Sequence, residues 1–197
     1  MKKINVIIGT VITLVASIIV SSSALADWTL DPGNSNLSYG TIKNGMIGES
    51  NSFKTISGSI DDSGHINIDI DLASVDTQLE LRDERMRDIV FKVAGNPSAK
   101  LTGDMSLQAH DDQEVGTSMV IEATISVEMV GEKVDHDVML VVTRLAENKV
   151  MVAPHGVIFI DADDYELLDA LEELRVLAGL DTIESVVPMS FYLTFTK

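Results

Sequence analysis

The side chains in this sequence that could do chemistry are four histidines, many carboxylates and one cluster of basic residues. Nucleophilic catalysis lacks its usual components, because the chain has no cysteine and no Gly-x-Ser-x-Gly motif. His65, His110, His136 and His155 lie in separate segments with no motif around them. We therefore predict that the protein is not an enzyme.

Two acidic segments have some of the residues of a metal site but not the required spacing. In a strand, Asp135 and Asp137 would point to one side and His136 to the other, so the three cannot converge on one ion. Segment 161–166 resembles a calcium-binding loop only in part, because Tyr165 stands where a ligand belongs. The sequence therefore predicts no metal site.

Positive charge gathers at Arg82, Arg85, Arg87, Lys92 and Lys100, just after a predicted strand. One interpretation is a solvated helix face, on which these side chains pair with neighbouring carboxylates for a few tenths of a kcal/mol per pair. The other is that one or two of the arginines point into the mouth of a cavity, where their donors would hold the polar head of an amphiphile. The residue types alone do not decide between these two interpretations.

The N-terminal segment has the features of an export signal. A basic start precedes an apolar run at 4–20, and Ala24-Leu25-Ala26 gives the small-x-small pattern of a cleavage site. We expect residues 1–26 to be a cleaved signal peptide and 27–197 to form one exported domain, extracytoplasmic and without disulfides. A retained membrane anchor is the alternative.

Composition excludes several classes of partner. The formal net charge is −17, and no acidic residue lies in the leader. Nucleic acids and anionic membrane surfaces both require a positive footprint, so neither is expected to bind, and no membrane insertion is expected after cleavage. Composition does not decide whether the protein forms a homodimer.

Alternating apolar residues predict an antiparallel β protein. Ile66, Ile68 and Ile70 alternate with polar residues, and a longer alternation runs over 118–130. Turn residues at 62–64 and 131–133 predict two hairpins. The predicted strands cover 36–40, 53–61, 65–72, 99–107, 118–130, 134–142, 149–160 and 188–196. About eight strands of this kind must close or stack to avoid free edges.

Two segments have helical periodicity. Thr77 and Glu80 have capping-box spacing before apolar residues recurring over 86–93. Leucines recur over 167–180, with Gly179 as the stop signal. Two short helices on a barrel or sandwich are expected to plug an end or cover a seam.

Several segments together resemble the YceI-like family of periplasmic lipid-binding proteins. They are Trp28 to Pro32, IDLASVDT at 70–77 leading into Arg82-Asp83, residues 123–140 and residues 159–191. The most specific part is the SVDT…RD element. This chain has Arg85 and Met86 where members commonly have His and Leu.

The resemblance implies an extended antiparallel lipocalin-like β-barrel that takes up a polyisoprenoid, quinone-like or fatty-acyl amphiphile as its ligand, without a cofactor. The expected tail-binding residues are Ile68, Ile70, Met119, Ile121, Ile125, Val127, Leu140, Phe191 and Leu193. The expected head-group residues are Arg82 and Asp83, supported by Ser74 and Asp76.

Two other functions remain alternatives. A filled barrel that acts as a protein-interaction or stress-tolerance module would contain no cavity. A lipid-modifying enzyme would need an acid and a base in the cavity, such as Asp83 with His65.

Overall fold

The computed structural model describes residues 27–105 and 113–197, so the predicted signal peptide at 1–26 and His110 lie outside the described residues. The strands are β1 (Trp28–Leu30), β2 (Asn36–Lys43), β3 (Ile47–Phe53), β4 (Ile56–Ile60), β5 (His65–Asp71), β6 (Val75–Asp76), β7 (Ser98–Asp104), β8 (Ser118–Met129), β9 (Glu132–Ala146), β10 (Lys149–Pro154), β11 (Ile158–Asp161) and β12 (Val186–Thr196). The helices are α1 (Glu80–Arg85) and α3 (Leu168–Ala178), and the short turns are η1 (Pro32–Asn34), η2 (Leu72–Ser74), η3 (Met86–Val90) and η4 (Asp163–Tyr165).

Eight antiparallel strands of the described chain close into a barrel in the order β1-β4-β5-β7-β8-β9-β10-β12. Closure is made where β1 pairs with β12, at Thr29 opposite Thr196 and Leu30 opposite Phe195. Each of these strands therefore has hydrogen-bonded neighbours on both sides, which removes the free edges of an open sheet. The predicted all-β barrel of about eight strands is confirmed.

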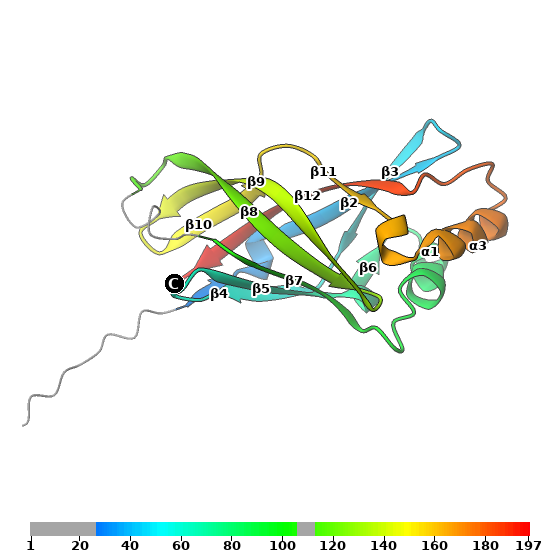
Figure 1. Cartoon of the computed structure of the whole chain (residues 1–197), viewed down its shortest axis with the longest axis horizontal. Coiled ribbons are helices and arrows are strands. Elements are labelled where there is room, and N and C mark those ends of the chain that lie inside the picture. The colour runs from blue at the N-terminus through cyan, green and yellow to red at the C-terminus, as the bar shows by residue number, and fades with distance from the viewer. Residues whose placement is uncertain (1–26, 106–112) are drawn as a thin grey trace, which may run out of the picture.

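Beyond this ring, the sheet continues toward the helical end of the molecule (Figure 1). The first half of β12 leaves β10 and pairs with β11 on one side and β2 on the other. Strands β3 and β6 extend this part of the sheet from β2. The barrel is thus elongated, and helices α1 and α3 lie at its far end (Figure 1).

The predicted alternation agrees with the burial of side chains in β5 and β8. Ile66, Ile68 and Ile70 are buried in the barrel, while the residues between them are more exposed. Strand β8 pairs along its whole length with β9. The predicted strand at 149–160 is divided into β10 and β11 by a bend at 155–156, and the predicted end at 107 of β7 lies outside the described residues.

The helix predictions were partly right. Helix α1 begins at Glu80 after Leu79, and no side chain caps it, so the predicted capping box does not form. The next segment, predicted as ordinary helix, is the π-helical turn η3. Helix α3 ends at Gly179, whose φ of 63° lies in the left-handed region, as the stop signal predicted.

Turn η4 is held against β9 by a contact between two rings. His136 Nε2 lies 2.9 Å from the Tyr165 hydroxyl, and the rings are stacked. Burial, with a further contribution from Asp164, raises the pKa of Tyr165 to about 12, so the phenol is neutral at physiological pH. This contact links the barrel wall to the segment that leads into α3.

Close packing of the strands depends on glycine at position 58, and this generates a stability prediction. A Cβ on Gly58 would lie 2.6 Å from the Asn67 carbonyl oxygen on the neighbouring strand. Gly58→Ala is expected to lower the free energy of unfolding by about 1–3 kcal/mol in urea denaturation, because the strands must separate. The matched control is Gly48→Ala, also in a strand, where a Cβ meets nothing within 4 Å. Equal stability of both variants would contradict this packing.

Candidate functional site

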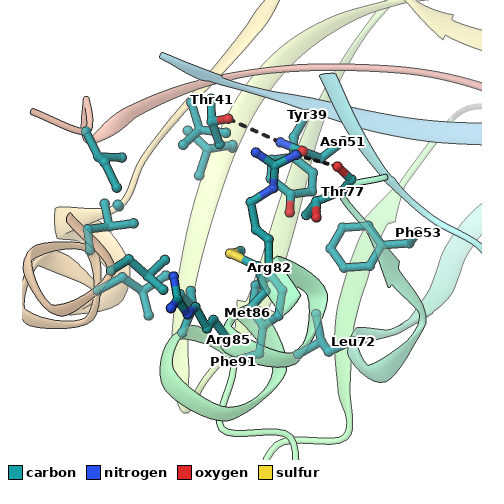
Figure 2. Close-up of a pocket in the computed structure, with 18 of the residues that line it drawn as sticks. Tyr39, Thr41, Asn51, Phe53, Leu72, Thr77, Arg82, Arg85, Met86 and Phe91 are labelled. Carbon is teal, nitrogen blue, oxygen red and sulfur yellow. Dashed lines mark hydrogen bonds between the residues drawn. The ribbon is translucent and has the colours of Figure 1, made fainter. Parts of the chain in front are cut away.

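A cavity of about 280 Å³ lies between the extended strands and the helical end of the barrel. Its walls come from β2, β3, β7, β8 and β12 and from α1, η3 and α3. Most of the lining is apolar, including Leu37, Phe53, Met86, Phe91 and Met189. Figure 2 shows part of this lining, with one polar corner among the apolar side chains.

A second cavity of about 50 Å³ continues deeper into the barrel. Its lining is apolar except for His136. Leu101, Val127, Ile160 and Met189 form walls of both cavities. The two spaces therefore adjoin along the barrel, as a site for an elongated apolar group requires.

The polar corner of the larger cavity is formed by facing residues of β2 and β3 together with α1. Tyr39 and Asn51 are direct cross-strand partners, so their side chains project from the same face of the sheet. Asn51 Nδ2 donates to Thr41 Oγ1 at 3.4 Å. Arg82 reaches this corner from α1, and its Nη2 donates to the Thr77 carbonyl oxygen (Figure 2).

Glu49 fixes the two positive side chains at the edge of this corner. Its Oε2 accepts from Arg82 Nη1 and pairs with Lys43 Nζ. The hydrogen bond from Arg82, with a further contribution from Lys43, holds the pKa of Glu49 below its usual value, against the opposing effect of burial. The Arg82 guanidinium thus already has a protein carboxylate as its partner, which it shares with Lys43.

Three polar atoms in this corner are buried without a hydrogen-bonding partner among the described residues. They are the Tyr39 hydroxyl, Asn51 Oδ1 and Arg82 Nε. Burial raises the pKa of Tyr39 far above its usual range, and the negative charge of Asp83 adds to this, while Arg82 acts in the opposite direction. Buried polar groups are nearly always hydrogen-bonded in folded proteins, so these three atoms are candidates for ligand contacts.

Asp83, the neighbour of Arg82, is buried on another side of α1. Its Oδ1 accepts from the Thr77 backbone N at 2.7 Å and from the Thr77 hydroxyl. This pair joins the start of α1 to the strand that precedes it. Arg82 and Asp83 point in different directions because successive helical residues are rotated by about 100°.

The structure distributes the predicted tail-binding residues over both cavities. Ile70 and Val127 line the larger one. The smaller one is lined by Ile68, Ile125, Val127, Leu140, Phe191 and Leu193. Met119 and Ile121 face inward and pack against the core, outside both linings.

Of the predicted head-group residues, Arg82 lines the larger cavity. Asp83, Ser74 and Asp76 are not part of either lining in the described chain. Ser74 Oγ accepts from the Thr55 N, and Asp76 accepts from the Gln78 N and pairs with Lys54. These contacts hold backbone turns beside the cavity.

Sequence reasoning missed Tyr39, Asn51 and Glu49. A usable signal existed in β2, where Leu37, Tyr39, Thr41 and Lys43 all face the cavity and become more polar along the strand. Strand β3 gave no such signal, because its inward positions carry Glu49 and Asn51, and these polar residue types are typical of loops.

The residues considered for catalysis are not brought together. His65 contacts Asp104 at the start of β5, whereas Asp83 contacts Thr77 beside α1. Asp135 and Asp137 accept hydrogen bonds from outward residues of β8, and His136 points inward to Tyr165, as alternation predicted. The described residues contain no group of three or more His, Asp or Glu side chains placed to hold a metal ion.

A closed antiparallel barrel with an internal apolar cavity defines the lipocalin-like class of small-ligand-binding proteins. Within this class, the chain belongs to the YceI-like domain family, whose model matches residues 28–195. The predicted family is therefore confirmed.

The solved structures that are similar to this chain include three bacterial proteins. A polyisoprenoid-binding domain from Saccharophagus degradans, implicated in plant cell wall breakdown, is 32% identical, with a TM-score of 0.84 over 86% of this chain and 97% of that one. Burkholderia cenocepacia BcnA is 14% identical, with a TM-score of 0.63 over 84% and 98% of the two chains. Campylobacter jejuni YceI is 16% identical, with a TM-score of 0.54 over 75% and 84%.

Two further comparisons are negative. No curated protein matches this sequence. Within residues 27–105 and 113–197, no helix is both long enough and apolar enough to cross a membrane.

The contact between Asp83 and Thr77 predicts a stability effect. Asp83→Ala is expected to lower the free energy of unfolding by about 1–3 kcal/mol, because the buried Thr77 N–H loses its acceptor. Urea denaturation followed by circular dichroism measures this. Glu84→Ala, at an exposed site on the same helix, is the control. Unchanged stability of Asp83→Ala with loss of ligand binding would instead favour the head-group role.

The environment of Glu49 predicts a pH effect. Its carboxyl has a folded-state pKa below the ordinary 4.5, so its contribution to stability is complete above pH 4.5 and is lost as pH falls through the lowered value. Glu49→Gln should therefore be less stable than the parent at neutral pH, and the difference should shrink in acid. Urea denaturation at a series of pH values tests this, with exposed Glu122→Gln as the control. A difference independent of pH would contradict the assignment.

Proposed function

We propose that this protein binds a long-chain amphiphile, such as a polyisoprenoid, quinone-like or fatty-acyl compound, and carries it in the periplasm without modifying it. The observation that carries the proposal is one apolar cavity that adjoins a second along the barrel and has unpartnered polar atoms at one corner. An apolar tail fits the two adjoining cavities, and a polar head fits the corner with the unpartnered polar atoms.

Burial of the tail supplies the driving force for binding. Each CH₂ removed from water contributes about 0.8 kcal/mol. A few isoprene units are therefore enough to offset the loss of translational freedom and the ordering of a flexible chain. The polar corner then decides the orientation of the ligand rather than most of its affinity.

Similarity to a polyisoprenoid-binding domain supports this proposal, because that domain shares about a third of its residues with this chain over nearly its whole length. The cavity argues against a filled barrel that acts only through its surface. The separation of His65 from Asp83 argues against a lipid-modifying enzyme built on that pair.

Native mass spectrometry of the protein purified from its own periplasm tests the proposal directly. A stoichiometric added mass is expected, and solvent extraction should release an amphiphile of that mass. The same preparation tests the periplasmic location, because the mature mass should correspond to cleavage before Asp27. A protein without added mass, which also takes up no isoprenoid or fatty acid, would overturn the proposal.

Filling the cavity should abolish uptake of the tail. Ala99 is buried in the wall of the larger cavity, so Ala99→Phe places a ring where the ligand would lie. Each displaced CH₂ weakens binding about fourfold, so affinity for a fluorescent apolar probe should fall at least about tenfold.

Ala153→Phe is the matched control for this variant, because Ala153 lies in β10 next to inward-facing Val152 and lines neither cavity. It should bind the probe as the parent does. Equal affinity of both variants would place the ligand elsewhere.

A further inference from the structure

The three unpartnered atoms in the polar corner have a definite hydrogen-bonding chemistry. Asn51 Oδ1 can only accept, Arg82 Nε–H can only donate, and the Tyr39 hydroxyl can do either. Asn51 is 3% exposed, so water does not readily satisfy it from outside. Its amide is oriented by the hydrogen bond from Nδ2 to Thr41, which leaves Oδ1 to face other partners.

The side chains that carry these atoms lie together. Tyr39 and Asn51 are paired across β2 and β3, and Arg82 is held beside them by its bonds to Glu49 and to the Thr77 carbonyl. Figure 2 shows Tyr39, Asn51 and Arg82 meeting at one corner of the cavity. All three residues line that cavity.

Charged side chains of both signs lie around this corner. Lys43 and Arg82 are positive, and Glu49 and Asp83 are negative. Arg82 and Lys43 share Glu49, so each already has a protein carboxylate as its partner. Arg85 also lines the cavity, but Figure 2 shows its side chain directed away from the other three. An anionic head would meet Asn51 Oδ1, an acceptor, and would compete with Glu49 for the guanidinium.

We propose that Tyr39, Asn51 and Arg82 form a site that selects a neutral hydroxyl head group on the bound amphiphile. One hydroxyl donates its proton to Asn51 Oδ1 and accepts from Arg82 Nε–H and the Tyr39 hydroxyl, so it satisfies all three atoms at once. A carbonyl or ether oxygen accepts only and leaves Asn51 Oδ1 unpaired. An ionised phosphate has no proton to donate to Asn51 Oδ1 and would place negative charge beside that acceptor.

This inference rests on the proposed function, since it concerns the head of the same ligand. Binding of farnesol, farnesyl methyl ether and farnesyl phosphate to the delipidated mature protein tests it, by displacement of the dye N-phenylnaphthylamine. The three compounds share one tail, so differences between them report on the head. Farnesol is expected to bind about tenfold more tightly than the ether, because the ether leaves a buried acceptor unpaired, and more tightly than the phosphate.

Two variants test whether the preference for farnesol over the ether arises from the polar corner. Tyr39→Phe and Asn51→Leu should each reduce the advantage of farnesol over the ether by several-fold, while the affinity for the dye stays near that of the parent. Tyr192→Phe, at an exposed site in β12, should leave the preference unchanged. The dye affinity also shows whether each variant has kept its cavity.

The outcomes separate the two proposals. If none of the three compounds binds, and the purified protein carries no added mass and takes up no fatty acid, the carrier function itself is wrong. If farnesol and the ether bind equally, or the Tyr39 and Asn51 variants keep the parent's preference, the carrier function stands and the hydroxyl site is overturned. Tightest binding of the phosphate, lost in Arg85→Gln, would also overturn it and assign an anionic head to Arg85.

Discussion

The fold depends on the pairing of a single strand, β12, along both of its edges. Its last residues join β10 to β1 and so close the barrel. Its first residues join β11 to β2 and carry the sheet past the ring. The same continuous strand therefore connects the extended strands beside the cavity to the closed barrel core. An open sheet of this length would instead expose unpaired edges.

The helical end of the barrel is where the strands no longer fill the interior with their own side chains. Strand β5 ends at η2, and the chain then forms β6, α1 and η3 before it returns in β7. Apolar side chains from α1, η3 and α3 cover this end but leave space between them and the sheet. A close-packed interior has few voids larger than a water molecule, so a space of this size indicates room for a ligand.

Polarity within that space is graded. Along β2 the inward side chains change from Leu37 through Tyr39 and Thr41 to Lys43, and β3 places Asn51 and Glu49 opposite them. Glu49 pairs with both positive side chains and fixes them at the edge of the corner. Asp83 contributes indirectly, since it fixes the turn from which Arg82 extends.

The sequence by itself determined the features that depend on local periodicity. Alternation in β5 and β8, turn residues such as Gly64 and Gly131, and the leucine repeat of α3 predicted most strands, the hairpins and one helix, because side-chain direction follows directly from backbone type. Basic residues after β5 also pointed to Arg82.

Only the tertiary structure decided which residues meet inside the cavity. Tyr39 and Asn51 become neighbours through strand register, and Arg82 joins them through a helix some thirty positions further along the chain. The segment of β3 has no apolar alternation, since its inward positions carry Glu49 and Asn51, so nothing local marks it as a strand. Likewise the adjacent Arg82 and Asp83 have different surroundings, because the helix turns one to the cavity and the other to Thr77. Such contacts between distant segments follow from packing, which periodicity does not encode.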